Sequence, residues 1–142
     1  MSYTCVDDLK LRLGDLYAGI YVRLDGTPMV GEAQADLDAA AAEIDAHIGV
    51  RYRTPVTDTV ALPLLKIWTL TLAEELAWSR SGKAEIPKNV ADRVANIRKV
   101  LEGIAAGEKQ LPGATEKTGS GATLSIVDAA KPVYTRKNLK GY

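Results

Sequence analysis

The stretch EAQADLDAAAAEIDAHI, residues 32–48, decides the fold, because its apolar residues recur at the spacing of an amphipathic helix. Six residues share one face of that helix: Ala33, Leu37, Ala40, Ala41, Ile44 and Ile48. At about 3.6 residues per turn, these side chains form one continuous stripe. The stretch therefore predicts a long helix that buries one side against a core.

The same helix carries small residues on roughly the opposite side. They are Ala35, Ala39, Ala42 and Ala46, at steps of four, three and four. Acids separate the two stripes, with Asp38 and Asp45 on one border and Glu32, Asp36 and Glu43 on the other. Such a helix can pack on two sides, so we expect a subunit interface at the four alanines, Asp38 and Asp45. Alanine is also the best surface helix former, and a plain solvent-exposed face remains equally open.

Three further helices are expected from the same periodicity. They span about 6–13, 62–80 and 87–106. The helix at 62–80 is apolar around most of its circumference, which predicts that it is central and the most buried. The helix at 87–106 has only a narrow apolar seam, so it should lie on the outside. The pattern predicts an all-α bundle of about four helices.

Local signals set the ends of these helices. Thr4 and Asp7 have the spacing of a capping box before the first helix, and Gly14 is its expected stop. Residues 15–31 are punctuated by glycines and turn residues. They predict an ordered loop that contains one helical turn.

Two arginines follow the 32–48 helix in the sequence Arg51-Tyr52-Arg53-Thr54-Pro55. Cations are favoured at a helix C-terminus, and Pro55 prevents the helix from continuing. We expect Arg51 and Arg53 to donate ion pairs between subunits.

The composition changes after Leu111-Pro112, and the change predicts two regions, a helical body at 1–112 and an arm at 113–142. The arm is rich in Gly, Ser and Thr, and it cannot build a core of its own. It nevertheless holds two short β-prone runs, 122–127 and 132–135. We expect it to be extended and to bind a partner through Leu124, Ile126, Val133, Tyr134 and Arg136.

The charge follows the same division. Residues 1–112 hold 13 Lys and Arg against 16 Asp and Glu, whereas residues 113–142 hold 5 against 2. The acidic balance of the body argues against nucleic-acid binding there. Dispersed cations in the arm more often keep a segment soluble or meet an acidic protein surface than bind phosphate.

Residues that carry catalysis are scarce. His47 is the single histidine, on the polar border of its helix, and Cys5 is the single cysteine. Neither has partners in sequence for nucleophilic chemistry or metal binding. We expect no enzyme activity, no cofactor and no metal site. No apolar run is long enough to span a bilayer, so a soluble protein made in a reducing cytoplasm is expected.

Several local signals together resemble one known family. They are Tyr3-Thr4-Cys5-Val6-Asp7-Asp8-Leu9 with Arg12-Leu13-Gly14, Glu43-Ile44-Asp45 at the end of the alanine-rich helix, the 51–55 element, and Leu101-Glu102-Gly103-Ile104-Ala105-Ala106-Gly107. In this order, across about residues 3–112, they are similar to the small protein of the head-to-tail region of Mu-like phages and prophages.

This resemblance implies a structural virion protein, the head-to-tail connector or adaptor. Its copies form a ring, usually dodecameric, below the portal protein and extend the channel through which DNA passes without specific binding. The implied location is the neck between capsid and tail, where the ring also contacts the next neck or tail protein. Two alternatives stay open: a tail-completion or stopper-like neck protein, and a small helical regulator that binds DNA or a partner.

Overall fold

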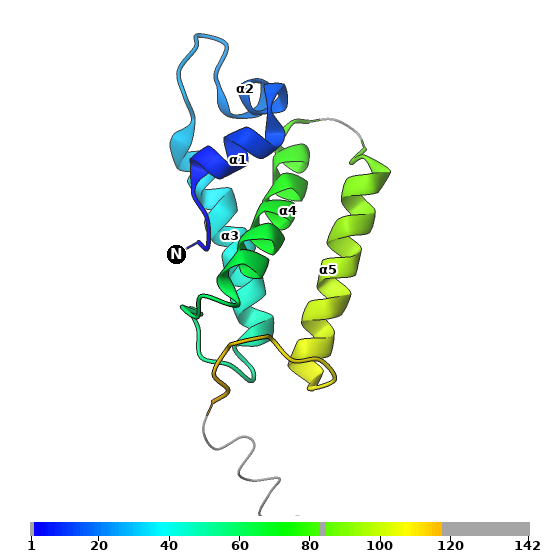
Figure 1. The fold of residues 1–142 in the computed structure, drawn as a ribbon. Helices are drawn as coiled ribbons and strands as arrows, with labels where there is room; N and C mark the ends of the chain where they lie inside the picture. The colour runs from blue at the N-terminus through cyan, green and yellow to red at the C-terminus, as the bar shows by residue number, and fades with distance from the viewer. Residues whose placement is uncertain (1, 83–84, 118–142) are drawn as a thin grey trace, which may run out of the picture.

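The computed structural model describes residues 2–82 and 85–117, and their secondary structure is almost entirely helical. The described helices are α1 (Val6–Leu13), α2 (Asp15–Tyr21), α3 (Val30–Ile48), α4 (Leu62–Arg80) and α5 (Lys88–Ala106). The three long helices α3, α4 and α5 form the body, and the short α1 and α2 cover one end of it (Figure 1). The predicted all-α class is confirmed for this part of the chain, while the β-prone runs of the arm lie outside it.

Helix α4 is the centre of the bundle, as predicted. It packs against α1, α2, α3 and α5, and Figure 1 shows it between α3 and α5. Leu65, Leu72, Ala73 and Ala77 along it are fully buried. Pro63 stands in its first turn, where the missing amide proton removes no helical hydrogen bond.

The apolar stripes predicted for α3 and α5 face the core. Every member of the α3 stripe is buried. On α5, Val90, Val94, Leu101 and Ile104 are buried and Ile97 is half-buried. The 3.6-residue periodicity therefore identified the packed side of both helices correctly.

The expected loop after α1 is wrong in part, because residues 15–21 form α2, a fifth helix in the described chain. Gly14 connects the two helices with a φ of 58° and a ψ of −128°, a conformation that L side chains rarely adopt. Tyr17, Ile20 and Tyr21 are buried, and this burial offsets the poor helix propensity of Gly19.

The cap of α1 is displaced by one residue from the predicted Thr4–Asp7 pair. Cys5 is the N-cap, and the Asp8 carboxylate accepts its backbone N–H at 3.5 Å. The Thr4 hydroxyl donates to the same carboxylate at 2.8 Å. Asp8 also pairs with Lys66 of α4 at 3.0 Å. The capping carboxylate is therefore held both by its position in the first turn of α1 and by an ion pair with another helix.

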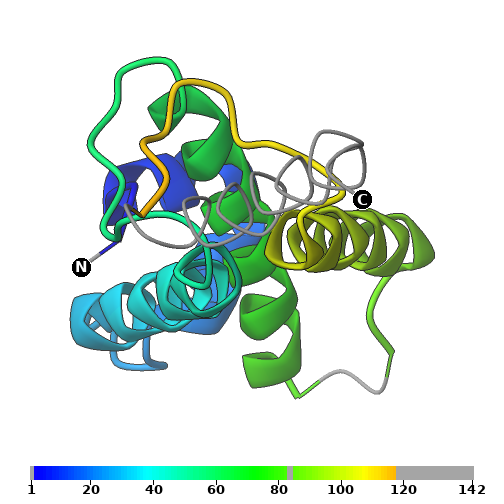
Figure 2. The ribbon, with the colours of Figure 1, turned by 90° about the horizontal axis from the view of Figure 1, so that it is seen from below.

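Residues 111–117 fold back against the loop that follows α3, and we call them the strap. Leu111 is buried, and its N–H donates to the Tyr52 hydroxyl at 3.0 Å. Tyr52 and Glu116 form an antiparallel bridge, and the Lys117 N–H donates to the Arg51 carbonyl at 2.7 Å. Figure 2 shows the strap crossing from the end of α5 to this loop.

Candidate assembly surface

The alanine row predicted on α3 lies on its solvent side. Ala35, Ala39, Ala42 and Ala46 are all exposed, and we call them the alanine face. The stripe on the other side of α3 is buried in the same helix. The structure thus brings the four predicted residues together on one open surface of small side chains.

The two acids predicted beside this face have different surroundings. Asp38 is half-buried and accepts a hydrogen bond from Gln34 Nε2 at 3.0 Å. Asp45 is also half-buried and accepts the Tyr3 hydroxyl, which in turn accepts the Val56 N–H at 3.1 Å. Burial raises the pKa of the Asp45 carboxyl, and the hydrogen bond from Tyr3 opposes that rise. Asp45 therefore ties the N-terminal residues to the loop after α3.

The two predicted arginines separate. Arg51 pairs with Glu116 of the strap at 2.6 Å, and its guanidinium lies 5.7 Å from the centre of the Tyr52 ring. Its charge is thus engaged within its own chain. Arg53 is exposed, and its backbone N–H donates to the Thr115 carbonyl at 3.4 Å. The arm residues Leu124, Ile126, Val133, Tyr134 and Arg136 lie outside the described residues.

Sequence reasoning missed the role of Asp36, which it placed on a polar border. Asp36 is buried and receives two hydrogen bonds from Arg80, at 3.0 and 2.8 Å, and one from the Tyr21 hydroxyl at 2.5 Å. These bonds join α2, α3 and α4, and the hydrogen bond to Asp36 raises the pKa of Arg80. Position 36 is three after Ala33 and four before Ala40, and this spacing signals the edge of the buried face.

A second ionic cluster joins the three long helices. Arg98 of α5 pairs with Glu43 of α3 at 2.7 Å and with Glu75 of α4 at 2.8 Å. The hydrogen bond to Glu43, followed by that to Glu75, raises the pKa of Arg98. Glu43, another acid beside the alanine face, is therefore also neutralised within the chain.

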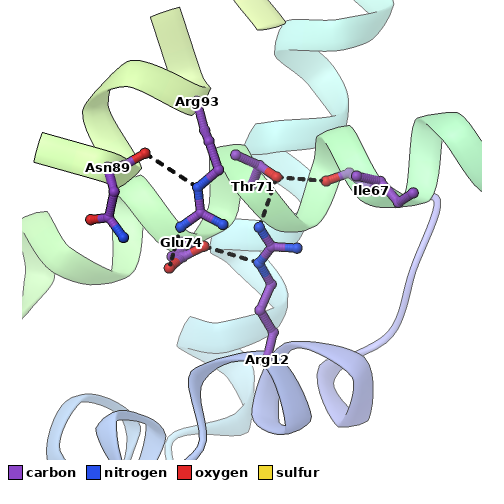
Figure 3. A network of polar contacts seen from close by, with 6 residues as sticks. All are labelled: Arg12, Ile67, Thr71, Glu74, Asn89 and Arg93. Atoms are coloured by element: carbon purple, nitrogen blue, oxygen red, sulfur yellow. Dashed lines mark hydrogen bonds and ion pairs between the residues drawn. The ribbon is translucent and has the colours of Figure 1, made fainter. Parts of the chain in front are cut away.

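A third cluster joins α1, α4 and α5 (Figure 3). Arg12 contacts Glu74 at 2.9 Å and Thr71 at 3.0 Å, and Arg93 approaches Glu74 at 3.5 Å. The adjacent acids Glu74 and Glu75 of α4 both form ion pairs with other helices. Their side chains diverge as expected for adjacent helical positions, and each thereby meets a different arginine of α5.

His47 and Cys5, the two residues considered above for catalysis or metal binding, have different surroundings in the described structure: one is next to a backbone carbonyl and the other is at the surface. The His47 ring nitrogen Nδ1 lies 2.9 Å from the Glu43 carbonyl, and Cys5 is exposed. Within residues 2–82 and 85–117, no three His, Cys, Asp or Glu side chains are grouped so as to hold a metal ion. No helix in that same part of the chain is long and apolar enough to cross a membrane.

The fold and this surface define a small all-α protein with one two-sided helix and three ionic clusters between helices. The family model described as Bacteriophage Mu, Gp36 matches residues 3–127, and the chain therefore belongs to that family. This confirms the resemblance to a Mu-like phage protein and indicates a role in phage structure or morphogenesis. No curated protein matches the chain significantly.

Proposed function

We propose that the protein is a head-to-tail connector, or adaptor, of a tailed phage, with no enzymatic role. Its copies assemble as a ring below the portal protein and extend the DNA channel toward the next neck or tail protein. The observation that carries this proposal is the exposed alanine face on a core helix of a Mu Gp36 family member. A ring closes through two different patches on each subunit, and the alanine face supplies one of them.

The alanine face is suited to helix packing. Alanine loses no side-chain rotamer entropy on burial, and its small size favours helix separations near the lower end of about 8–10 Å. Asp36, Glu43 and Asp45 on its borders already have partners within the chain. Burying the face therefore removes few unpaired charges from water, which lowers the cost of association.

Charge supports the role of a channel wall through which DNA slides. The helical body, residues 1–112, carries more acids than bases. Tight DNA binding depends on neutralising phosphates with clustered Lys and Arg. A mildly acidic body holds the passing phosphate backbone weakly.

Light scattering of the purified full chain, alone and with its portal protein, tests the proposal. We expect a ring-sized species, formed alone or on the portal. Ala39→Glu and Ala42→Glu should reduce assembly strongly, because each places a charge at the centre of the alanine face. Ala95→Glu is the matched control, since Ala95 is also exposed but lies on α5, and glutamate is compatible with all three helix positions.

Two results would overturn the connector assignment. A chain that stays monomeric or dimeric with the portal would favour a small regulator. A ring that ignores the portal and binds only a tail-side component would favour a stopper-like or tail-completion protein. If Ala39→Glu and Ala42→Glu reduced assembly no more than the control Ala95→Glu, the alanine face would not be part of the subunit interface.

A further inference from the structure

An apolar groove lies between α1, α2 and the start of α3. Its volume is about 690 Å³, and Val6, Tyr17, Val22 and Val30 contribute apolar lining. A second hollow of about 540 Å³, lined in part by Leu11, shares Asp7, Lys10 and Gly14 with it. The two hollows therefore form one continuous surface across α1.

Large apolar side chains on the rim of this groove are open to water. Leu11 is 82% exposed and Val30 is 51% exposed. An apolar hollow with an exposed apolar rim typically marks a binding site for another chain or ligand. The groove is thus a surface that a partner segment would cover.

We propose that the groove receives residues 122–127 from the arm of a neighbouring copy. This inference rests on the proposed ring and names the site that the arm occupies. The segment reads Ala-Thr-Leu-Ser-Ile-Val, so Leu124 and Ile126 fall on one side of an extended chain, and Thr123 and Ser125 on the other. The apolar side matches the apolar lining, and the hydroxyl side stays in water.

Charge favours the same occupant. The groove and its rim carry Asp7 and Asp15 against Lys10, and the Lys10 ammonium lies over the Tyr17 ring at 5.9 Å. The chain beyond residue 127 carries four cations and one acid: Lys131, Arg136, Lys137, Lys140 and Asp128. A basic segment that follows the docked residues would meet the acidic rim.

The reach of the chain favours a neighbouring copy as the source of an arm that covers the Val30 end of the groove. Lys117 contacts Gly49 and Arg51, so the described chain ends at the C-terminal end of α3, whereas Val30 begins that helix. Eighteen helical steps separate the ends of α3, or about 27 Å. Leu124 follows Lys117 by seven residues and reaches at most about 25 Å when fully extended. Leu124 therefore cannot reach the Val30 end of the groove in its own chain, although Gln34, which lines the groove nearer the C-terminal end of α3, is within reach.

Cys5 provides a direct test, because it lines the groove, is exposed, and is the single cysteine of the chain. A tagged chain with Leu124→Cys and Cys5→Ser is assembled with the unmodified chain, with portal protein if the ring requires it. Oxidised glutathione is added, and disulfides are read on a non-reducing gel. We expect a mixed disulfide between one tagged and one untagged chain. Ser125→Cys in place of Leu124→Cys should lower its yield several-fold.

Groove variants of the untagged chain complete the test. Val30→Arg should lower the yield of mixed disulfide several-fold, while Ile67→Arg should not, because Ile67 is similarly exposed at 54% but lies on α4 outside the groove lining. A ring in light scattering without the mixed disulfide would overturn the arm-to-groove contact and leave the connector proposal standing. A disulfide within single chains carrying both Cys5 and Leu124→Cys would also overturn it. Absence of any ring would overturn both the arm-to-groove contact and the connector proposal.

Discussion

Asp36 shows how one buried side chain coordinates three helices. Its carboxylate is buried and holds Arg80 and Tyr21. Asp36→Ala leaves the Arg80 guanidinium without these bonds, so we expect a loss of about 2–3 kcal/mol in unfolding free energy. Urea unfolding followed by circular dichroism measures it.

The control for this prediction is Asp92→Ala on α5, where the side chain is exposed. Exposed substitutions of this kind usually change stability by less than about 0.5 kcal/mol. If Asp36→Ala and Asp92→Ala cost the same, the Asp36 cluster does not stabilise the fold.

Asp45 predicts a specific pH dependence, because burial raises its pKa above the ordinary value of 3.8. A group whose pKa is higher in the folded state favours folding when protonated. Its contribution is present below pH 3.8 and is lost as the pH rises through the raised pKa. Asparagine at position 45 does not titrate, so Asp45→Asn does not lose this contribution. The unfolding free energy of the variant should therefore increase relative to that of the natural chain as the pH rises from 3.5 to 7. Urea unfolding across that range measures the difference.

Asp8→Asn is a control of opposite sign. Hydrogen bonds from Thr4, then Lys66 and Cys5, lower the pKa of Asp8 from 3.8. Its contribution is present above pH 3.8 and is lost as the pH falls through the lowered pKa. This variant should therefore lose stability relative to the natural chain as the pH rises. Parallel pH profiles for the two variants would contradict both assignments.

At the scale of elements, two glycines offer a matched pair. Gly107 ends α5 with a φ of 86°, whereas Gly19 lies inside α2, where an added Cβ meets no atom within 4 Å. Gly107→Ala should cost about 1 kcal/mol for the left-handed backbone. Gly19→Ala should gain about 0.5–1 kcal/mol from helix propensity. Thermal unfolding of the two variants measures both shifts, and a shift of the same sign in each would contradict this account.

The elements also show where periodicity suffices and where it does not. The bounds of α1 and α4 match the expected ranges, and those of α3 and α5 differ by one or two residues, because each carries a clear apolar stripe and end signals. Helix α2 was predicted only as one helical turn within a loop, because its glycine lowers the local helix propensity. Tyr17, Ile20 and Tyr21 are buried in the core, and this tertiary burial favours the full helix.

At the scale of the whole molecule, the strap packs against the helical body. Its Leu111 is buried in the core, and the Leu111 N–H donates to the hydroxyl of the buried Tyr52. A chain truncated after residue 110 loses this burial and the strap hydrogen bonds, and we expect a loss of more than about 3 kcal/mol in unfolding free energy. Truncation after residue 117 retains those contacts and should change stability by less than about 0.5 kcal/mol. Urea unfolding of both truncated chains measures this. Equal losses would show that stabilisation comes from beyond residue 117.

The candidate surface was predictable in part. The alanine spacing on α3 placed four residues on one face, and the structure exposes that face. The partner of Arg51 was not predictable, because Glu116 is far away in sequence and meets it only when the strap folds back. The same is true of Asp45 and Tyr3.

The sequence by itself determined the helical class, the buried side of each long helix and the membership of a Mu-like phage family, because periodicity and local order are properties of neighbouring residues. The tertiary structure alone decided which charges are paired, that residues 15–21 form a full helix and not a single turn, and where the apolar groove opens. Those features depend on contacts between residues distant in the chain. Such contacts exist only in the folded bundle, where α4 packs against α1, α2, α3 and α5.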